Sequence, residues 1–184
     1  NLPNLTYIDN LEFAETGELA SLSQALQSRR GRFQPTIVSY GDVLFNKYIP
    51  QALCQEQDDC VIFVDSNWRD QSSYARLGGF AECSIPNSRK AFNAKIHLKQ
   101  LGKNLPEESI HGVWMGFLKL SSSAASQVND LLLDMLADPA NRRAGIPQLL
   151  QALLKQDVPV RVLYTVGHWL DVNSLEDVVQ AGNF

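Results

Sequence analysis

Three aspartates follow segments that the sequence predicts to be strands. Asp42 comes after the β-branched run TIV and Ser39, Asp65 closes the run CVIFVD, and Asp171 follows residues 158–165 within GHWLDV. In an open α/β sheet, ligands bind outside the carboxyl ends of the strands, because loops and helix starts converge there. The three carboxylates are therefore candidates for one site at a sheet edge.

Each of these aspartates also has a plainer interpretation, as a helix cap or a turn residue. Asp65 precedes a Ser-Asn pair, which favours a turn. Asp171 is not needed as a cap, because Ser174 already stands before the next predicted helix. Carboxylates that face each other across a crevice suit Mg²⁺, which takes oxygen ligands and adds waters and substrate phosphates. We therefore interpret Asp42 and Asp171 as a candidate magnesium pair.

The remaining reactive side chains form no recognisable catalytic motif. The histidines have no partner at a telling spacing, so surface or hydrogen-bonded roles are favoured for His97, His111 and His168. The cysteines are odd in number and lack a C-x-x-C pair, which indicates reduced thiols. The sequence contains no G-x-S-x-G, no G-x-x-x-x-G-K-[ST] and no G-x-G-x-x-G.

Length and charge exclude several classes of protein. A chain of 184 residues, 45% of them hydrophobic, predicts a single domain over residues 1–184. The net charge of −4 and the lack of a dense basic face disfavour a nucleic-acid partner. No apolar run approaches the roughly 20 residues that span a bilayer, and the amino end lacks a signal-peptide pattern. We expect a cytoplasmic protein without a membrane segment.

The elements that must position the aspartates alternate along the chain. Strands are predicted at residues 36–39, 60–65, 113–121 and 158–165, with weaker ones at 79–84 and 95–98. Helices are predicted at residues 17–27 behind Thr16, at 43–53 around Pro50, within SSSAASQVNDLLLDML, at 146–155, and after Ser174.

The run CVIFVD is β-branched and does not alternate, which is typical of a strand buried on both faces in a parallel sheet. The predicted fold class is therefore α/β, doubly wound and Rossmann-like, with a mostly parallel central sheet and helices on both faces.

Four segments resemble, in order, the later part of the cytidylyltransferases of phosphonate biosynthesis. They are ETGELASLSQAL, VSYGDVLFNKYI with CVIFVDSNW, IHGVWMGFLKLS, and VGHWLDVNSLEDVVQA. Those enzymes are often fused behind a phosphoenolpyruvate phosphomutase domain and belong to the sugar-phosphate and phosphocholine nucleotidyltransferase superfamily. Y-G-D after a strand, combined with W-x-D-V-[ND]-[ST]-x-E-D near the end, characterises the group, although neither half does so alone.

The resemblance implies a role for six residues and a set of ligands. Asp42 and Asp171 would be catalytic and would hold the Mg²⁺ that bridges the nucleotide phosphate and the incoming phosphonate. Glu18 and Ser21 would lie beside the nucleotide, and Trp114 and Trp169 beside the acceptor. The implied partners are CTP, a small phosphonate or phosphate ester, and a fused or associated phosphoenolpyruvate phosphomutase domain.

The sequence departs from the family at two places. Family members begin with a strand and a glycine-rich loop that wraps the triphosphate, whereas this sequence starts just before the TGE-like helix. At least one βαβ unit of the family, roughly 30 residues or more, therefore has no counterpart here, and we expect either a piece of a larger protein or a domain that has lost catalysis. In both cases we expect this chain alone to be inactive. Val113 stands where the family carries an acidic residue, which weakens the assignment of the acceptor.

The sequence thus predicts the carboxyl-terminal part of a CTP-dependent nucleotidyltransferase that transfers a cytidylyl group to a small phosphonate and releases pyrophosphate. Two alternatives remain open. The first is transfer to a sugar phosphate or phosphocholine. The second is a non-catalytic nucleotidyltransferase-like domain that supports a fused or partner enzyme.

Overall fold

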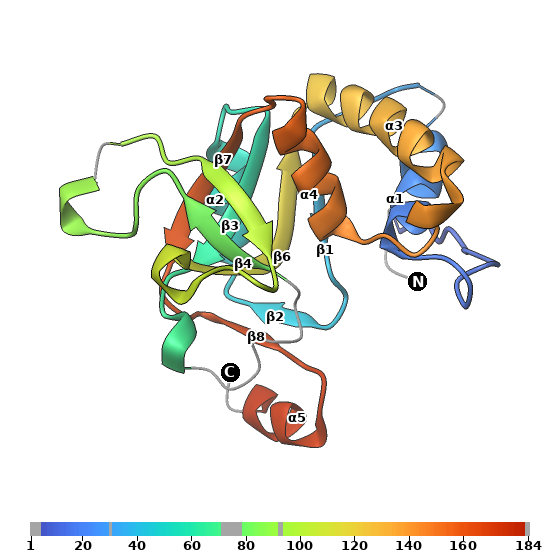
Figure 1. Cartoon of the computed structure of the whole chain (residues 1–184). Coiled ribbons are helices and arrows are strands. Elements are labelled where there is room, and N and C mark those ends of the chain that lie inside the picture. Colours follow the sequence, from blue (N-terminus) through green and yellow to red (C-terminus); the bar gives the residue numbers. More distant parts are fainter. Residues whose placement is uncertain (1–4, 30, 71–78, 92–93, 183–184) are drawn as a thin grey trace.

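A six-stranded sheet forms the centre of the fold (Figure 1). The computed structural model describes residues 5–29, 31–70, 79–91 and 94–182. The strands lie in the order β5-β4-β6-β3-β7, and β1 pairs with β6. Their bounds are β1 Thr36–Ser39, β3 Cys60–Asp65, β4 Phe80–Cys83, β5 Leu98–Gly102, β6 Gly112–Leu120 and β7 Val160–Thr165. A separate two-stranded sheet pairs β2 (Val43–Phe45) with β8 (Trp169–Asp171).

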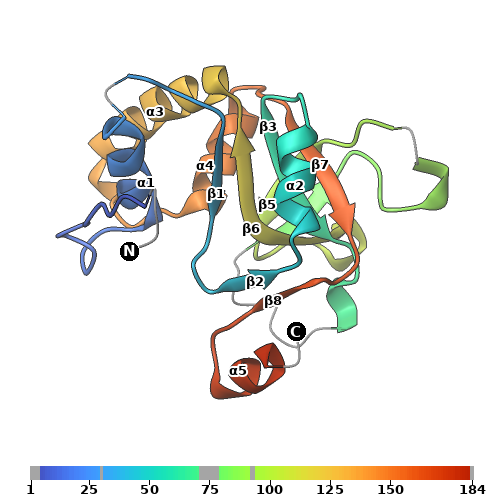
Figure 2. The same cartoon turned by 180° about the vertical axis from the view of Figure 1, so that it is seen from behind.

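Helices cover both faces of the central sheet, as the two opposite views show (Figures 1 and 2). The α-helices are α1 Glu18–Gln27, α2 Tyr48–Gln55, α3 Ser122–Ala137, α4 Ile146–Lys155 and α5 Leu175–Ala181. Short 3-10 turns are η1 Trp68–Asp70, η2 Arg89–Ala91, η3 Glu107–Ser109 and η4 Pro139–Asn141. Among the described residues, none of these helices combines the length and the apolar character that crossing a membrane requires.

Strand β3 separates two hydrophobic clusters. Cys60, Ile62 and Val64 join the buried leucines of α1, α3 and α4, whereas Val61 and Phe63 join the cluster that contains α2. Every residue of β3 is buried. The prediction of a strand buried on both faces is therefore confirmed, and so is the α/β class with a helix-flanked central sheet.

The expectation of a mostly parallel sheet is wrong. Among the described strands, β3 and β7 alone pair in parallel, while β6 is antiparallel to β1, β3 and β4, and β4 is antiparallel to β5. The prediction failed because helices bury both faces of this sheet. Under such helices the strands of an antiparallel sheet are also continuously apolar. A run such as CVIFVD therefore reports burial and not strand direction.

The predicted helices and strands differ from the structure in local details. Residues 43–45 form β2 and not the start of a helix, because they pair with β8, and α2 begins only at Tyr48. Gly17, and not Thr16, is the N-cap residue of α1. Strand β5 lies at Leu98–Gly102, beyond most of the predicted residues 95–98. The helix at residues 146–155 and the capping box of Ser174 with Asp177 are confirmed.

A kink in β6 makes room for a side chain above the sheet. Residues 115–117 of β6 lie opposite Phe63 alone, and Gly116 in their centre has a left-handed φ of 82°. A Cβ atom at Gly116 would lie 2.6 Å from Cδ2 of Tyr40. Glycine is therefore required twice at this position, for the backbone conformation and for the space that the Tyr40 ring occupies.

We predict that Gly116→Ala lowers the free energy of unfolding by about 1–3 kcal/mol, because alanine is strained at this φ and collides with Tyr40. Gly41→Ala is the matched control, since a Cβ there meets no atom within 4 Å. The control is expected to change stability by no more than about 0.5 kcal/mol. Urea unfolding of both variants measures the difference, and equal stability of the two would contradict the role assigned to Gly116.

Candidate active site

The pairing of β2 with β8 brings two aspartates together from distant parts of the sequence. Val43 pairs with Asp171 in the antiparallel register, and the backbone N–H of Val172 donates to the carbonyl oxygen of Asp42 at 2.8 Å. Asp171 is buried, with 2% of its surface exposed, whereas Asp42 is exposed in the turn between β1 and β2. Their meeting point is this small sheet beside the central one, and not the edge of the central sheet itself.

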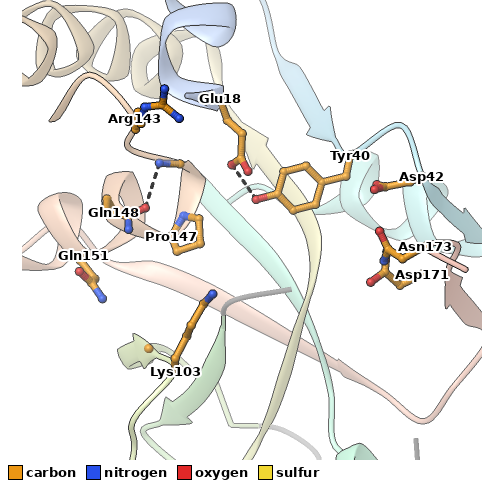
Figure 3. A pocket seen from close by; sticks show the side chains of 12 residues that line it. Glu18, Tyr40, Asp42, Lys103, Arg143, Pro147, Gln148, Gln151, Asp171 and Asn173 are labelled. Carbon is orange, nitrogen blue, oxygen red and sulfur yellow. Dashed lines mark hydrogen bonds between the residues drawn. The ribbon is translucent and has the colours of Figure 1, made fainter. Parts of the chain in front are cut away.

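Both aspartates line a cavity of about 410 Å³ between the central sheet, α1 and α4. Figure 3 shows Asp42, Asp171 and Asn173 grouped on one side of it, and Arg143, Gln148 and Gln151 on the other. Lys103, which follows β5, lies nearer the second group than the aspartates. The size of the cavity is within the range of pockets that hold small ligands.

Glu18 and Tyr40 form a bridge along the wall of the cavity (Figure 3). The Tyr40 hydroxyl donates to Oε2 of Glu18 at 2.7 Å, and the same oxygen accepts the backbone N–H of Ile146 at 2.9 Å. Glu18 thereby satisfies a free N–H group at the start of α4, where a carboxylate is electrostatically favoured. The bridge fixes α1, α4 and the segment after β1 relative to one another.

Negative charge gathers around Tyr40. Burial raises the pKa of its phenol most strongly, followed by the hydrogen bond to Glu18 and the charges of Glu18, Asp42 and Asp171. Tyr40 therefore stays protonated and acts as a hydrogen-bond donor. On the opposite wall, Lys103 is exposed, and Nη2 of Arg143 donates to the carbonyl oxygen of Ala14 at 3.1 Å. The cavity is thus polarised, with Asp42 and Asp171 on one side and two cations on the other, while the Glu18 carboxylate lies at the start of α4.

The carboxylate wall has the donor set that Mg²⁺ prefers. Asp42 and Asp171 offer oxygen ligands, and Mg²⁺ usually binds one or two carboxylates and completes its octahedron with waters and substrate phosphates. Among the described residues there is no cluster of three or more histidine, cysteine, aspartate or glutamate side chains that could hold a metal ion. A two-carboxylate site of this kind would share its ion with a substrate, and magnesium binding stays a prediction.

Of the four other predicted site residues, one lines the cavity, one is exposed on α1 and two are buried in the core. Glu18 lines the cavity, whereas Ser21 is exposed one turn further along α1, and its Oγ accepts from Asn10 Nδ2 at 3.0 Å. Trp114 and Trp169 are buried, with 0% and 4% exposure, and neither is among the residues that line the cavity. Their place beside an acceptor stays a prediction. Each indole ring is packed in the core and donates its N–H to a buried oxygen, as large amphipathic rings usually do.

Several residues of the cavity were not predicted from the sequence. Tyr40 is the first residue of the Y-G-D motif, so its position beside Asp42 was the available signal. Lys103, Arg143 and Gln151 come from three segments without a motif, and only the packing of α4 against β5 brings them to one wall. The spacing of these residues in the sequence does not indicate that they lie close together in the fold.

Comparison with known proteins identifies the fold. No family model and no curated protein matches the sequence. Among solved structures, the inositol-1-phosphate CTP transferase from T. maritima is similar, with a TM-score of 0.62, 15% identity, and coverage of 92% of this chain and 60% of that one.

Two further structures show the same likeness. UDP-glucose pyrophosphorylase complexed with UDP-glucose has a TM-score of 0.65 and 15% identity, over 92% of this chain and 61% of that one. The CTP:phosphocholine cytidylyltransferase from Streptococcus pneumoniae has a TM-score of 0.62 and 11% identity, over 95% and 66%. The chain therefore has a nucleotidyltransferase-like fold and spans 60 to 66% of the length of these three structures.

The raised pKa of Tyr40 predicts a stability change at alkaline pH. Above about pH 10 the phenol ionises in the unfolded chain but stays protonated in the folded one, so the unfolded state binds fewer protons. The free energy of unfolding should therefore decrease as pH rises beyond this point. In Tyr40→Phe this decrease should be smaller, and at neutral pH the lost bond to Glu18 should cost about 0.5–1.5 kcal/mol.

Urea unfolding at about pH 9 and about pH 11 measures this difference. Tyr164, whose pKa burial also raises, remains in both proteins, so a part of the alkaline loss persists in the variant. Tyr7→Phe is the control, because the Tyr7 side chain is 81% exposed. An identical pH dependence in wild type and Tyr40→Phe would overturn the assignment.

Proposed function

We propose that this chain is the carboxyl-terminal part of a CTP-dependent nucleotidyltransferase that transfers a cytidylyl group to a small phosphonate. In this reaction an acceptor oxygen attacks the α-phosphorus of CTP. The bond from that phosphorus to the bridging oxygen breaks, and pyrophosphate leaves with the bonding electron pair. The fold supports the nucleotidyltransferase class, and the cytidylyl and phosphonate specificities rest on the sequence resemblance.

One observation carries the proposal. Asp42 and Asp171, which belong to the two halves of the resembling motif, lie far apart in the sequence but on one wall of a single cavity. Two neighbouring carboxylates repel each other, so bringing them together costs free energy. A shared function for the two carboxylates would explain why the fold places them on one wall. Their convergence opposite Lys103 and Arg143 suits a ligand that combines a cation-binding face with further anionic groups.

The residues of the cavity would have three different roles. Asp42 and Asp171 would hold a Mg²⁺ ion, which on binding neutralises charge that keeps two anionic substrates apart. Lys103 and Arg143 would bind phosphate or phosphonate oxygens from the opposite wall. Tyr40 and Glu18 would fix the distance between the two walls, since their hydrogen bond joins the segment after β1 to the start of α4.

The remaining parts of the proposal rest on the resemblance alone. They are an acceptor that is a phosphonate and not a sugar phosphate or phosphocholine, a cytoplasmic location, and association with a phosphoenolpyruvate phosphomutase domain. Residues 1–184 alone are proposed to be inactive, because the family binds the triphosphate with a glycine-rich loop that precedes the matched segments. Activity is therefore to be measured on the full-length protein.

We predict that Asp171→Asn in the full-length protein folds normally and loses activity. Asparagine keeps the shape of the side chain and removes the charge that would anchor the ion, so transfer should fall by roughly a hundredfold or more, or about 3 kcal/mol. Asp134→Asn, at an exposed position of α3, is the matched control. The measurement is Mg²⁺-dependent pyrophosphate release from CTP, with phosphonate, sugar-phosphate and phosphocholine acceptors compared side by side.

A thermal melt of each variant separates catalysis from folding. Wild-type activity in Asp171→Asn, or activity lost only in proportion to unfolded protein, would return this aspartate to a structural role. The non-catalytic alternative would then be the better account of the chain.

A second prediction concerns the cationic wall. Lys103→Gln keeps most of the length of the side chain but removes its charge, so KM for an anionic substrate should rise about five- to tenfold while kcat is retained. Lys155→Gln, in the last turn of α4 and exposed, is the control. Steady-state kinetics with CTP and the acceptor varied in turn identify which substrate Lys103 contacts. Unchanged KM for both would remove Lys103 from the site.

A further inference from the structure

A buried carboxylate outside the cavity accepts hydrogen bonds from the segment that leads to Asp171. Asp65, the last residue of β3, is 0% exposed. Its Oδ1 accepts the backbone N–H groups of Asn67 at 2.9 Å and Gly167 at 3.2 Å, and its Oδ2 accepts the indole N–H of Trp169 at 2.8 Å. The turn predicted from the sequence accounts for Asn67 alone. The other two bonds reach across to the connection between β7 and β8.

That connection has an unfavourable backbone conformation. Gly167 and His168 are consecutive left-handed residues with φ values of 67° and 65°, and for histidine this conformation is costly. Such a turn persists only where its surroundings hold it. Asp65 binds the residues on either side of His168, and the His168 carbonyl oxygen accepts the backbone N–H of Asn46 at 3.0 Å.

We propose that Asp65 is a positioning residue, which fixes the 167–169 turn and thereby sets the register of β8 on β2 and the place of Asp171 in the cavity. The catalytic consequence rests on the function proposed above, whereas the structural one does not. Trp169 is held at both ends, since its indole binds Asp65 and its backbone pairs with Phe45 of β2. A shift of the turn would move Trp169 and Asp171 as one strand.

The carboxylate cannot be replaced by its amide without conflict. In Asp65→Asn one acceptor oxygen becomes an NH₂ group, which meets either the Trp169 indole N–H or the backbone N–H groups of Asn67 and Gly167. At least one buried donor then loses its acceptor. Trp169→Phe removes the indole N–H, so the double variant Asp65→Asn/Trp169→Phe lets the remaining oxygen serve the two backbone donors.

Hydrogen exchange followed by NMR tests the positioning role independently of activity. In Asp65→Asn the amide hydrogens of Asn46 and Val172, which donate to His168 and Asp42, should exchange about tenfold faster or more. The amide of Ser121, which bonds to Asp59 beyond the opposite end of β3, should keep its wild-type rate. The double variant should regain part of the protection, and Asp134→Asn should resemble the wild type.

Two outcomes would overturn the proposal. Wild-type protection of Asn46 and Val172 in Asp65→Asn would show that the carboxylate does not hold the turn. Equal acceleration at Asn46, Val172 and Ser121 would show a general loss of stability without a positioning role.

Kinetics of the full-length protein then test the catalytic consequence. Displacement of Asp171 should lower kcat of Asp65→Asn by about tenfold to a hundredfold with little change in the KM for CTP, and the double variant should recover part of the loss. Wild-type kcat in Asp65→Asn despite faster exchange would overturn the link between the turn and the site. If the wild type transfers no cytidylyl group to any acceptor, the proposed function fails, and the exchange result decides the structural inference by itself.

Discussion

The backbone pairing of β2 with β8 is the constraint on which the candidate site depends. Neither strand belongs to the central sheet, and each has three residues. Two such short strands form a marginal unit by themselves, because a two-stranded ribbon buries little surface. The pairing persists because both ends are attached to buried structure: Val43 and Trp169 lie in the cluster around α2, and Asp65 binds the turn before β8.

Each of the two hydrophobic clusters supports one wall of the cavity. The cluster with α2 supports the ribbon that carries Asp42 and Asp171. The cluster with α1 and α4 supports the opposite wall, where Gln151 donates to the carbonyl oxygen of Leu101 in β5 at 2.6 Å. The Tyr40 ring lies on the kink of β6 between these regions, and its hydroxyl reaches Glu18. A change in β6 would therefore alter both walls together.

The distribution of charged residues around the cavity supports a ligand site more strongly than either aspartate does alone. Burial raises the pKa of the Tyr40 phenol most strongly, and the charges of Glu18, Asp42 and Asp171 raise it further because all three carboxylates lie near the ring. Proteins collect like charges where a bound cation or a catalytic task compensates the repulsion. Lys103 and Arg143 lie on the facing wall, so the charge of the cavity differs between its two sides. A ligand with both positive and negative groups would therefore bind in one orientation.

The sequence by itself determined the elements with strong local patterns, and it singled out the two aspartates that the structure brings to one cavity. Strand β3, helix α4 and the Ser174 cap follow from burial, helical period and capping chemistry, which act over a few residues. Strand direction, the β2–β8 ribbon and the cationic wall depended on tertiary contacts between segments far apart in the chain. The same holds for Asp65: its neighbours indicate a turn, and only folding brings the Gly167 and Trp169 donors to its carboxylate.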